Sequence, residues 1–230
     1  MESPAAGKIF ARAASLLVRN PAIVVPGIVV GCLAALVQFA LEPDPLAALD
    51  ASMWTRLLQA VAQIVAAIVS IAYTTGMADA AWQTGRARFG DGTRAFRRDG
   101  GHVFVAMLVL FALGFGAALL APFSFGLSLV AYIFFFIYTM AAAVVGERPG
   151  FVAVRESIEI AFRRPLPTLL TVLGVLLIAF AMGAVATLLA VAPLIGPLVA
   201  ALVIQTVIAY VVLVIVGEYR ALRNRGLTLA

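Results

Sequence analysis

Six apolar runs of membrane-spanning length follow one another along the chain. They cover about residues 21–41, 57–78, 103–121, 126–145, 166–191 and 198–216. A helix needs about 20 mainly apolar residues to cross the hydrocarbon core of a bilayer. Only 12% of the residues are charged, whereas about 25% are charged in soluble domains. The sequence therefore predicts an all-α integral membrane protein with six transmembrane helices, and residues 1–230 are expected to form a single membrane domain.

Basic residues fall almost entirely on one side of these spans. Six crossings place both ends of the chain on the same side, together with fifteen of the sixteen Lys and Arg residues, and Arg56 falls opposite. Cytoplasmic loops carry the excess of Lys and Arg, so we expect a multi-pass protein with both termini in the cytoplasm. This topology explains the net charge of +5, and no nucleic-acid partner is expected. The first residues lack the pattern of a secretory signal, so the mature chain is expected to begin at its own N-terminus.

A charged junction precedes three of the apolar runs. The central junction, RARFGDGTRAFRRDGG at residues 86–101, carries five arginines. Its Ala-Phe-Arg-Arg sequence returns at residues 161–164, and the Arg-Asn-Pro sequence at residues 19–21 is a looser copy. Any six-span protein with basic loops looks periodic, but this self-similarity favours a true repeat. We therefore divide the domain into three units, at about residues 5–85, 86–146 and 147–230.

Each unit is expected to hold a cytoplasmic amphipathic surface helix followed by a transmembrane hairpin. Three parallel units would be related by a possible pseudo-threefold repeat about the membrane normal. In the central unit, Asp91 or Thr93 could cap a short helix, and Gly100-Gly101 could end it. In the third unit, the helical spacing predicts a packing face with Phe151, Val154, Ile158, Ala161 and Phe162, and a polar face with Arg155, Glu156, Glu159 and Arg163.

Three carboxylates, Asp79, Glu147 and Glu218, occupy equivalent positions at the cytoplasmic ends of the second, fourth and sixth runs. A charge within a span costs at least about 2.5 kcal/mol and is a functional candidate by default. The three could form a cluster at a cytoplasmic mouth that binds a cationic group or carries protons. Alternatively, each could pair with an arginine of a surface helix, such as Arg97, Arg163 or Arg19. Because so many basic residues surround the carboxylates, we favour the structural interpretation.

No catalytic or metal-binding set can be assembled from the sequence. The single cysteine, Cys32, and the single histidine, His102, have no partners at ligand spacing, and no HExxH motif occurs. We therefore expect no enzyme activity, no cofactor and no metal. Arginines at headgroup level attract anionic phospholipid, which makes membrane lipids the expected partners. The candidate headgroup contacts are Arg94, Arg97, Arg98, Arg163 and Arg164.

Four segments carry a resemblance to a known family: ASLLVRNPAIVVPG, GRARFGDGTRAF, VVGERPGFVAVRESIEIAFRRP and VGEYRALR. With them, the chain resembles the bacterial six-span membrane proteins related to the membrane domain of glycerophosphodiester phosphodiesterases and its uncharacterised small relatives. The resemblance implies an all-helical module of the bacterial cytoplasmic (inner) membrane. A phosphodiesterase domain accompanies this module in some relatives, but these 230 residues contain none, so hydrolysis is not implied.

Three functions fit these observations. The first, which we prefer, is a non-enzymatic module that handles or senses lipids or another amphiphile, and a lipid-sized cavity between the hairpins would support it. The second is a small-solute transporter with its path between the hairpins, which buried, unpaired carboxylates would favour. The third is a membrane scaffold whose surface helices dock an unknown protein partner, and an exposed apolar patch facing away from lipid would favour it.

Overall fold

Every regular element in the described part of the chain is a helix. The computed structural model describes residues 6–41, 53–191 and 196–224. In chain order the elements are α1 (Ala6–Arg19), the 3-10 turn η1 (Pro21–Val24), α2 (Val25–Leu41), α3 (Met53–Thr84), α4 (Phe89–Leu120), α5 (Leu127–Phe136), α6 (Thr139–Val144), α7 (Gly150–Arg163), α8 (Pro165–Ala190) and α9 (Gly196–Arg223). The predicted all-α class is confirmed.

Five described helical segments are long and apolar enough to cross a membrane. They are Leu57–Thr84, Phe89–Leu120, Leu127–Val144, Pro165–Leu189 and Leu198–Arg223. A sixth crossing requires that α1 and α2 count as one span, although Gly7–Arg19 and Pro21–Leu33 meet at 93°. The helices therefore fit a multi-pass membrane protein, while the arrangement with six spans stays a prediction.

The sharp bend between α1 and α2 follows from the Asn20-Pro21 sequence. Proline disfavours the helical conformation in the residue before it, and Asn20 has φ −132° and ψ 62°. The buried Asn20 amide donates to the carbonyl oxygens of Leu16 (2.9 Å) and Gly85 (3.2 Å), and its oxygen accepts from the Ala87 N–H (2.8 Å). Asn20 thus ties the bend to the loop between α3 and α4.

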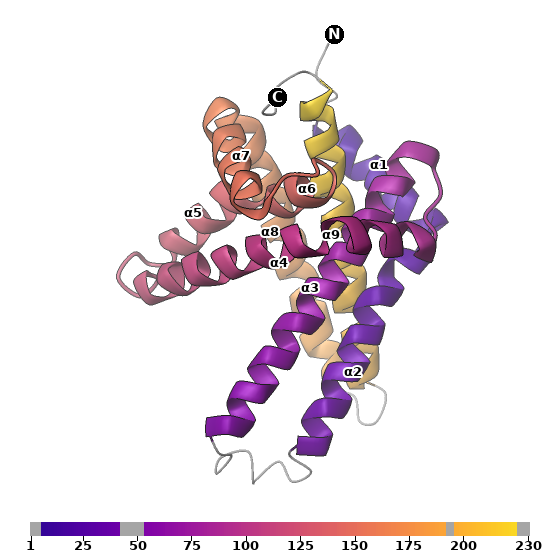
Figure 1. Cartoon of the computed structure of the whole chain (residues 1–230), viewed down its shortest axis with the longest axis vertical. Helices are drawn as coiled ribbons and strands as arrows, with labels where there is room; N and C mark the ends of the chain where they lie inside the picture. Colours follow the sequence, from indigo (N-terminus) through magenta and orange to yellow (C-terminus); the bar gives the residue numbers. More distant parts are fainter. Residues whose placement is uncertain (1–5, 42–52, 192–195, 225–230) are drawn as a thin grey trace.

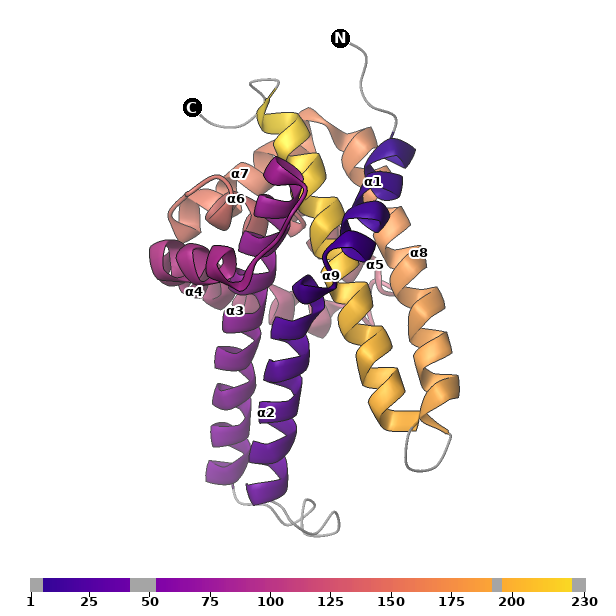
Figure 2. The same cartoon turned by 90° about the vertical axis from the view of Figure 1, so that its right-hand side faces the viewer.

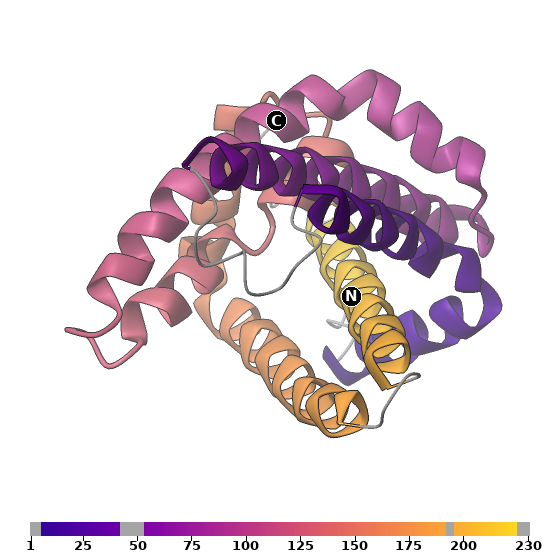
Figure 3. The same cartoon turned by 90° about the horizontal axis from the view of Figure 1, so that it is seen from below.

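The long helices do not all run in one direction. Figures 1 and 2 show α2 beside α3 and α8 beside α9, whereas α4 runs crosswise to α3. Seen from below, α9 lies between the α2–α3 pair and α8, and α4 and α5 follow the outside of the molecule (Figure 3). Three equivalent hairpins and a pseudo-threefold repeat therefore stay predictions.

Small residues let α3 and α4 approach closely where they cross. A Cβ atom at Gly92 of α4 would lie 2.7 Å from Cδ1 of Tyr73 on α3, which is closer than side-chain atoms can pack. Gly76 of α3 faces Ala95 of α4 in the same contact. Small residues at a crossing allow two backbones to come together, and this packing is a main source of helix association in membranes.

The prediction that Gly100-Gly101 ends a helix is wrong. α4 begins at Phe89 and runs through both glycines to Leu120, so the central surface helix and the third apolar run form one helix. A glycine ends a helix when it takes the left-handed conformation, and among the described glycines Gly85 (φ +76°) and Gly126 (φ +82°) do so. Gly85 follows α3 and donates to the Ala81 carbonyl oxygen at 2.9 Å.

Both predicted amphipathic helices outside the central stretch are present, as α1 and α7. The α1 and α7 helices, the α3–α4 loop and the last turns of α9 gather toward one end of the molecule, at the top of Figure 1. These segments carry most of the basic residues, and the first turns of α3 lie at the opposite end. Which side of the membrane the basic end faces stays a prediction.

The packing face of α7 is turned relative to the prediction. Phe151 and Phe162 were expected to pack inward, but both are 69% exposed. The buried face contains Ala153, Ser157 and Ile160, together with Val154 and Ala161 of the predicted face. Small side chains bring α7 close to its neighbours, and the two phenylalanines point outward, where apolar surface is tolerated in a membrane protein.

Candidate functional site

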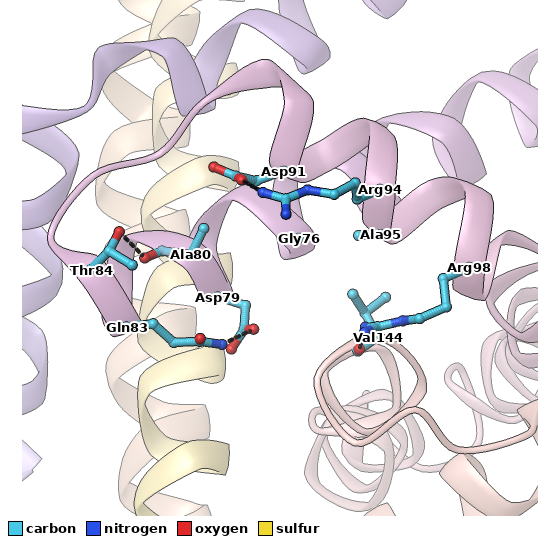
Figure 4. Close-up of a pocket in the computed structure, with 10 residues that line it drawn as sticks. All are labelled: Gly76, Asp79, Ala80, Gln83, Thr84, Asp91, Arg94, Ala95, Arg98 and Val144. Atoms are coloured by element: carbon cyan, nitrogen blue, oxygen red, sulfur yellow. Dashed lines mark hydrogen bonds and ion pairs between the residues drawn. The ribbon is translucent and has the colours of Figure 1, made fainter.

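A charged cleft of about 600 Å³ opens between the C-terminal turns of α3 and the N-terminal half of α4 (Figure 4). It is lined by Gly76, Asp79, Ala80, Gln83, Thr84, Asp91, Arg94, Ala95, Arg98 and Val144. The close crossing at Gly76 and Ala95 brings the two helices together at this place. Val144, the last residue of α6, adds a wall from a third element. The cleft thus gathers side chains from distant parts of the sequence.

A smaller hollow of about 280 Å³ shares Thr84, Asp91 and Arg94 with the charged cleft and adds Arg86 and Arg88. Both added arginines are exposed, and neither forms an ion pair with another described residue. Together, four arginines and two aspartates line the two hollows. The surroundings of the charged cleft are therefore net positive.

Arg94 and Arg98 are held differently at the cleft. Arg94 pairs with Asp91 one turn earlier, yet its side chain is 82% exposed. The Asp91 carboxylate also accepts from the Arg88 backbone N–H at 2.8 Å. Asp91 thus takes part in capping from within the first turn of α4, whereas the N-cap residue is Arg88 and not the predicted Asp91 or Thr93. Arg98 pairs with Asp99 (2.9 Å) and donates to the Val144 carbonyl oxygen (3.1 Å). Arg94 is thus free to reorient toward a ligand, whereas Arg98 is fixed.

Two of the three predicted carboxylates lie around Arg98. Glu147 pairs with it at 2.6 Å, and the Asp79 carboxylate also acts on Arg98 electrostatically. Asp79 accepts from Gln83 at 2.6 Å and pairs with Arg220 of α9. Arginines therefore compensate both carboxylates, as the structural interpretation requires, although the partners are Arg98 and Arg220 instead of the ones suggested from sequence.

The third carboxylate, Glu218, is buried elsewhere. It accepts a hydrogen bond from the Thr171 hydroxyl of α8, and it does not line the charged cleft. It forms no ion pair with any described residue.

The remaining candidate headgroup arginines lie outside the cleft lining. Arg97 is exposed and forms no ion pair within the described part of the chain. Arg163 pairs with Glu159 one turn earlier on α7 at 3.5 Å. Arg164 is partly buried at the N-terminus of α8. Arg94 and Arg98 therefore lie together at the charged cleft, whereas Arg163 and Arg164 form a second group where α7 meets α8.

An apolar crevice of about 320 Å³ lies between α3, α8, α9 and the α5–α6 region. Ile71 and Thr75 of α3 and Val216 of α9 are among its lining residues. Residues four apart lie one above the other on a helix, so Asp79 stands one turn beyond Thr75, and Arg220 stands one turn beyond Val216. The Asp79–Arg220 ion pair therefore lies at the end of the apolar crevice that faces the charged cleft.

Sequence reasoning missed a buried carboxylate on α7. Glu156 was placed on the polar face, but this is wrong, because Glu156 is 0% exposed. Its carboxylate pairs with Arg148 (3.1 Å) and accepts from the Tyr219 hydroxyl (2.6 Å). Its position three residues after Ala153 and four before Ile160, both buried, could have indicated the inward face.

No protein-family model, no curated protein and no solved structure matches the chain. The resemblance to membrane domains of glycerophosphodiester phosphodiesterases therefore stays a prediction. Within the described residues, no group of three or more His, Cys, Asp or Glu side chains is placed to hold a metal ion.

Proposed function

We propose that this protein is a non-enzymatic inner-membrane module that binds an anionic phospholipid. Its headgroup occupies the charged cleft, and one acyl chain follows the apolar crevice. The observation that carries the proposal is that α3 lines both a polar and an apolar hollow, with Asp79 of the charged cleft one turn beyond Thr75 of the apolar crevice. An amphiphile is the class of ligand that needs both hollows at once.

The charges favour an anionic headgroup over a zwitterionic one. Arg86 and Arg88 have no carboxylate partner among the described residues, and Arg94 is largely exposed beside them. Asp79 is already compensated by Arg220, so it adds little repulsion. Each basic side chain near a membrane surface contributes about 1 kcal/mol toward anionic lipid. A phosphate group with a further negative charge is therefore preferred.

The apolar crevice orients the lipid but does not select it. Lipid tails are as apolar as the aliphatic side chains around them, so moving a tail from the bilayer into the crevice yields little hydrophobic free energy. Selectivity then depends on the headgroup. Variants that remove cleft arginines should change which lipid is bound, whereas variants that fill the crevice should weaken all lipids alike.

The test compares two pairs of arginines that differ in position but not in number. Arg88→Gln/Arg94→Gln removes two charges from the cleft, and Arg155→Gln/Arg163→Gln removes two exposed charges from α7. Phosphatidylglycerol and phosphatidylethanolamine are titrated into the purified protein, and bound lipid is counted by native mass spectrometry. The cleft variant is expected to lose about 2 kcal/mol, which is roughly a 30-fold weaker affinity for phosphatidylglycerol.

The α7 variant is the matched control and should keep its affinity within about threefold, since a change that small corresponds to well under 1 kcal/mol. An equal loss in both variants would show that the arginines act only through general surface charge. Equal binding of both lipids by the unmodified protein would show that the cleft selects no headgroup. Either result would refute the proposal.

One observation favours the alternative of a small-solute transporter. Glu218 is a buried carboxylate without an ion-pair partner among the described residues, as expected for a side chain that takes part in ion coupling. The charged cleft does not include it. Transport is therefore the second candidate function, and lipid binding at the cleft does not depend on it.

A further inference from the structure

Glu218 differs from the other buried carboxylates of the described chain. Asp99 and Glu156 are also buried, but each pairs with an arginine, Arg98 or Arg148. Glu218 is 8% exposed, and its bonded partner is the Thr171 hydroxyl. A buried charge without a counter-charge is costly. Something other than an arginine must therefore compensate it.

Three hydroxyl groups surround this carboxylate. Thr171 donates to it, and the Tyr138 hydroxyl lies next to Glu218, Thr168 and Thr171. All three hydroxyl-bearing residues are fully buried. Nevertheless, neither the Tyr138 hydroxyl nor the Thr168 hydroxyl has a partner at hydrogen-bonding distance and angle among the described residues. Buried hydroxyl groups normally have a hydrogen-bond partner. These two hydroxyl groups therefore lie next to the Glu218 carboxylate with hydrogen-bonding capacity left unused.

The surrounding backbone adds a second indication. Tyr138 lies at the break between α5 and α6, two helices that together form one candidate span. Thr168 and Thr171 belong to the first two turns of α8. Interrupted helices at ion sites are a recurrent feature of membrane transport proteins, because the break brings oxygen atoms to a bound cation. Of the cluster, Tyr138 comes from this break, whose own backbone groups bond to Ser157 of α7, whereas Glu218, Thr168 and Thr171 lie on unbroken helices.

We propose that Glu218, Thr171, Thr168 and Tyr138 form a binding site for one dehydrated alkali-metal cation. Hard cations prefer oxygen ligands, and each hydroxyl oxygen has lone pairs to offer. One monovalent cation neutralises the one carboxylate. A divalent cation would leave an unpaired positive charge in a buried site, which is disfavoured for the same reason as the free carboxylate.

Neighbouring arginines do not compete for this carboxylate. Arg220, two residues further along α9, pairs with Asp79 of α3. Arg223 donates to the Val145 carbonyl oxygen at 2.5 Å. Arg164, one turn before Thr168 on α8, forms no ion pair with another described residue. The cation is therefore the partner that this site lacks.

The experiment measures cation binding directly and through stability. The purified protein is kept in choline chloride, and NaCl, KCl or CaCl₂ replaces part of it at constant ionic strength. Na⁺ is expected to raise the midpoint of thermal unfolding with a saturable dose dependence that choline does not produce. Equilibrium uptake of radioactive ²²Na⁺ is expected to reach one ion per chain.

Two conservative variants and one control identify the residues. Glu218→Gln should abolish ²²Na⁺ uptake, and Thr168→Val should weaken it at least tenfold. Thr187→Val removes a hydroxyl from the same helix, where it bonds to the Gly183 carbonyl oxygen, and it should leave uptake unchanged. The ²²Na⁺ measurement does not depend on a change in stability. A variant with a lower midpoint of thermal unfolding can therefore still be tested for ²²Na⁺ binding, provided that it elutes as a folded protein in size-exclusion chromatography.

Three results would overturn the proposal. The first is the absence of ²²Na⁺ uptake together with no specific effect of NaCl or KCl on the unfolding midpoint. The second is a larger stabilisation by CaCl₂ than by either alkali salt. The third is unchanged uptake in Glu218→Gln. Lipid binding at the charged cleft is measured separately and is expected to be the same in Glu218→Gln as in the unmodified protein.

Discussion

Tyr219→Phe tests the buried contact that links α9 to α7. The Tyr219 side chain is 1% exposed, and its hydroxyl donates to the Glu156 carboxylate at 2.6 Å. This distance is typical of a hydrogen bond to an ionised carboxylate. The substitution removes one oxygen atom and keeps the aromatic ring, so it leaves no large cavity. The measured change is therefore assigned to the hydrogen bond.

The expected loss follows from burial and charge. A hydrogen bond to a charged group contributes about 1.5–3 kcal/mol to stability. Arg148 remains 3.1 Å from the carboxylate, so Glu156 keeps a counter-charge, and the larger penalty of an unpaired buried charge is avoided. Tyr219→Phe should thus lower the free energy of unfolding by about 1.5–3 kcal/mol, which is a roughly 10- to 160-fold shift in the equilibrium.

A second tyrosine on α9 provides the control. The Tyr210 hydroxyl donates to the Phe10 carbonyl oxygen at 3.1 Å, a bond between neutral groups, and its loss should cost about 0.5–1.5 kcal/mol. Unfolding is measured by far-ultraviolet circular dichroism as sodium dodecyl sulfate is added to mixed micelles. A Tyr219→Phe effect below about 0.5 kcal/mol, or no larger than that of Tyr210→Phe, would refute the assignment of a strong charged hydrogen bond.

Two further predictions concern the α3–α4 crossing and the α1–α2 bend. Gly92→Ala should destabilise the protein by about 1–3 kcal/mol because the added methyl group meets Tyr73. The control Gly90→Ala, whose added methyl group has no neighbour within 4 Å, should be neutral or stabilise the protein by up to about 1 kcal/mol. Equal stabilities of the two variants in the same titration would contradict the close crossing. Asn20→Ala should lower the free energy of unfolding by about 1–3 kcal/mol and speed tryptic cleavage in the loop at residues 85–88. An unchanged cleavage rate would contradict the role of the Asn20 hydrogen bonds in holding this loop.

Sequence periodicity predicted the helices well but misjudged where one of them ends. The apolar runs and the two amphipathic helices appear as helices, because both patterns are local properties of the chain, although the fourth run is divided into α5 and α6. Gly100-Gly101 looked like a helix end, yet α4 continues through it. A glycine within a helix costs only about 1 kcal/mol, and the packing of α4 against α3 and α7 outweighs this cost.

The candidate arginines could be found from sequence, but their partners could not. Arg94 and Arg98 belong to a dense basic run, and both line the charged cleft. The ion pair between Asp79 and Arg220 joins residues 141 positions apart, and no local pattern connects them. The crosswise course of α4 depends on the contact at Gly76 and Gly92, whose partners are likewise on another helix.

Charge alone did not reveal which carboxylates are buried. Glu156 and Glu218 each lie within four residues of an arginine in sequence, yet neither pairs with that arginine. Glu156 reaches Arg148 because that arginine approaches from the preceding loop. On α9, Arg220 turns toward Asp79 and leaves Glu218 facing α8. Since the nearby arginine stabilises another carboxylate, Glu218 is left without a counter-charge among the described residues, and this is the physical reason to look for a bound cation there.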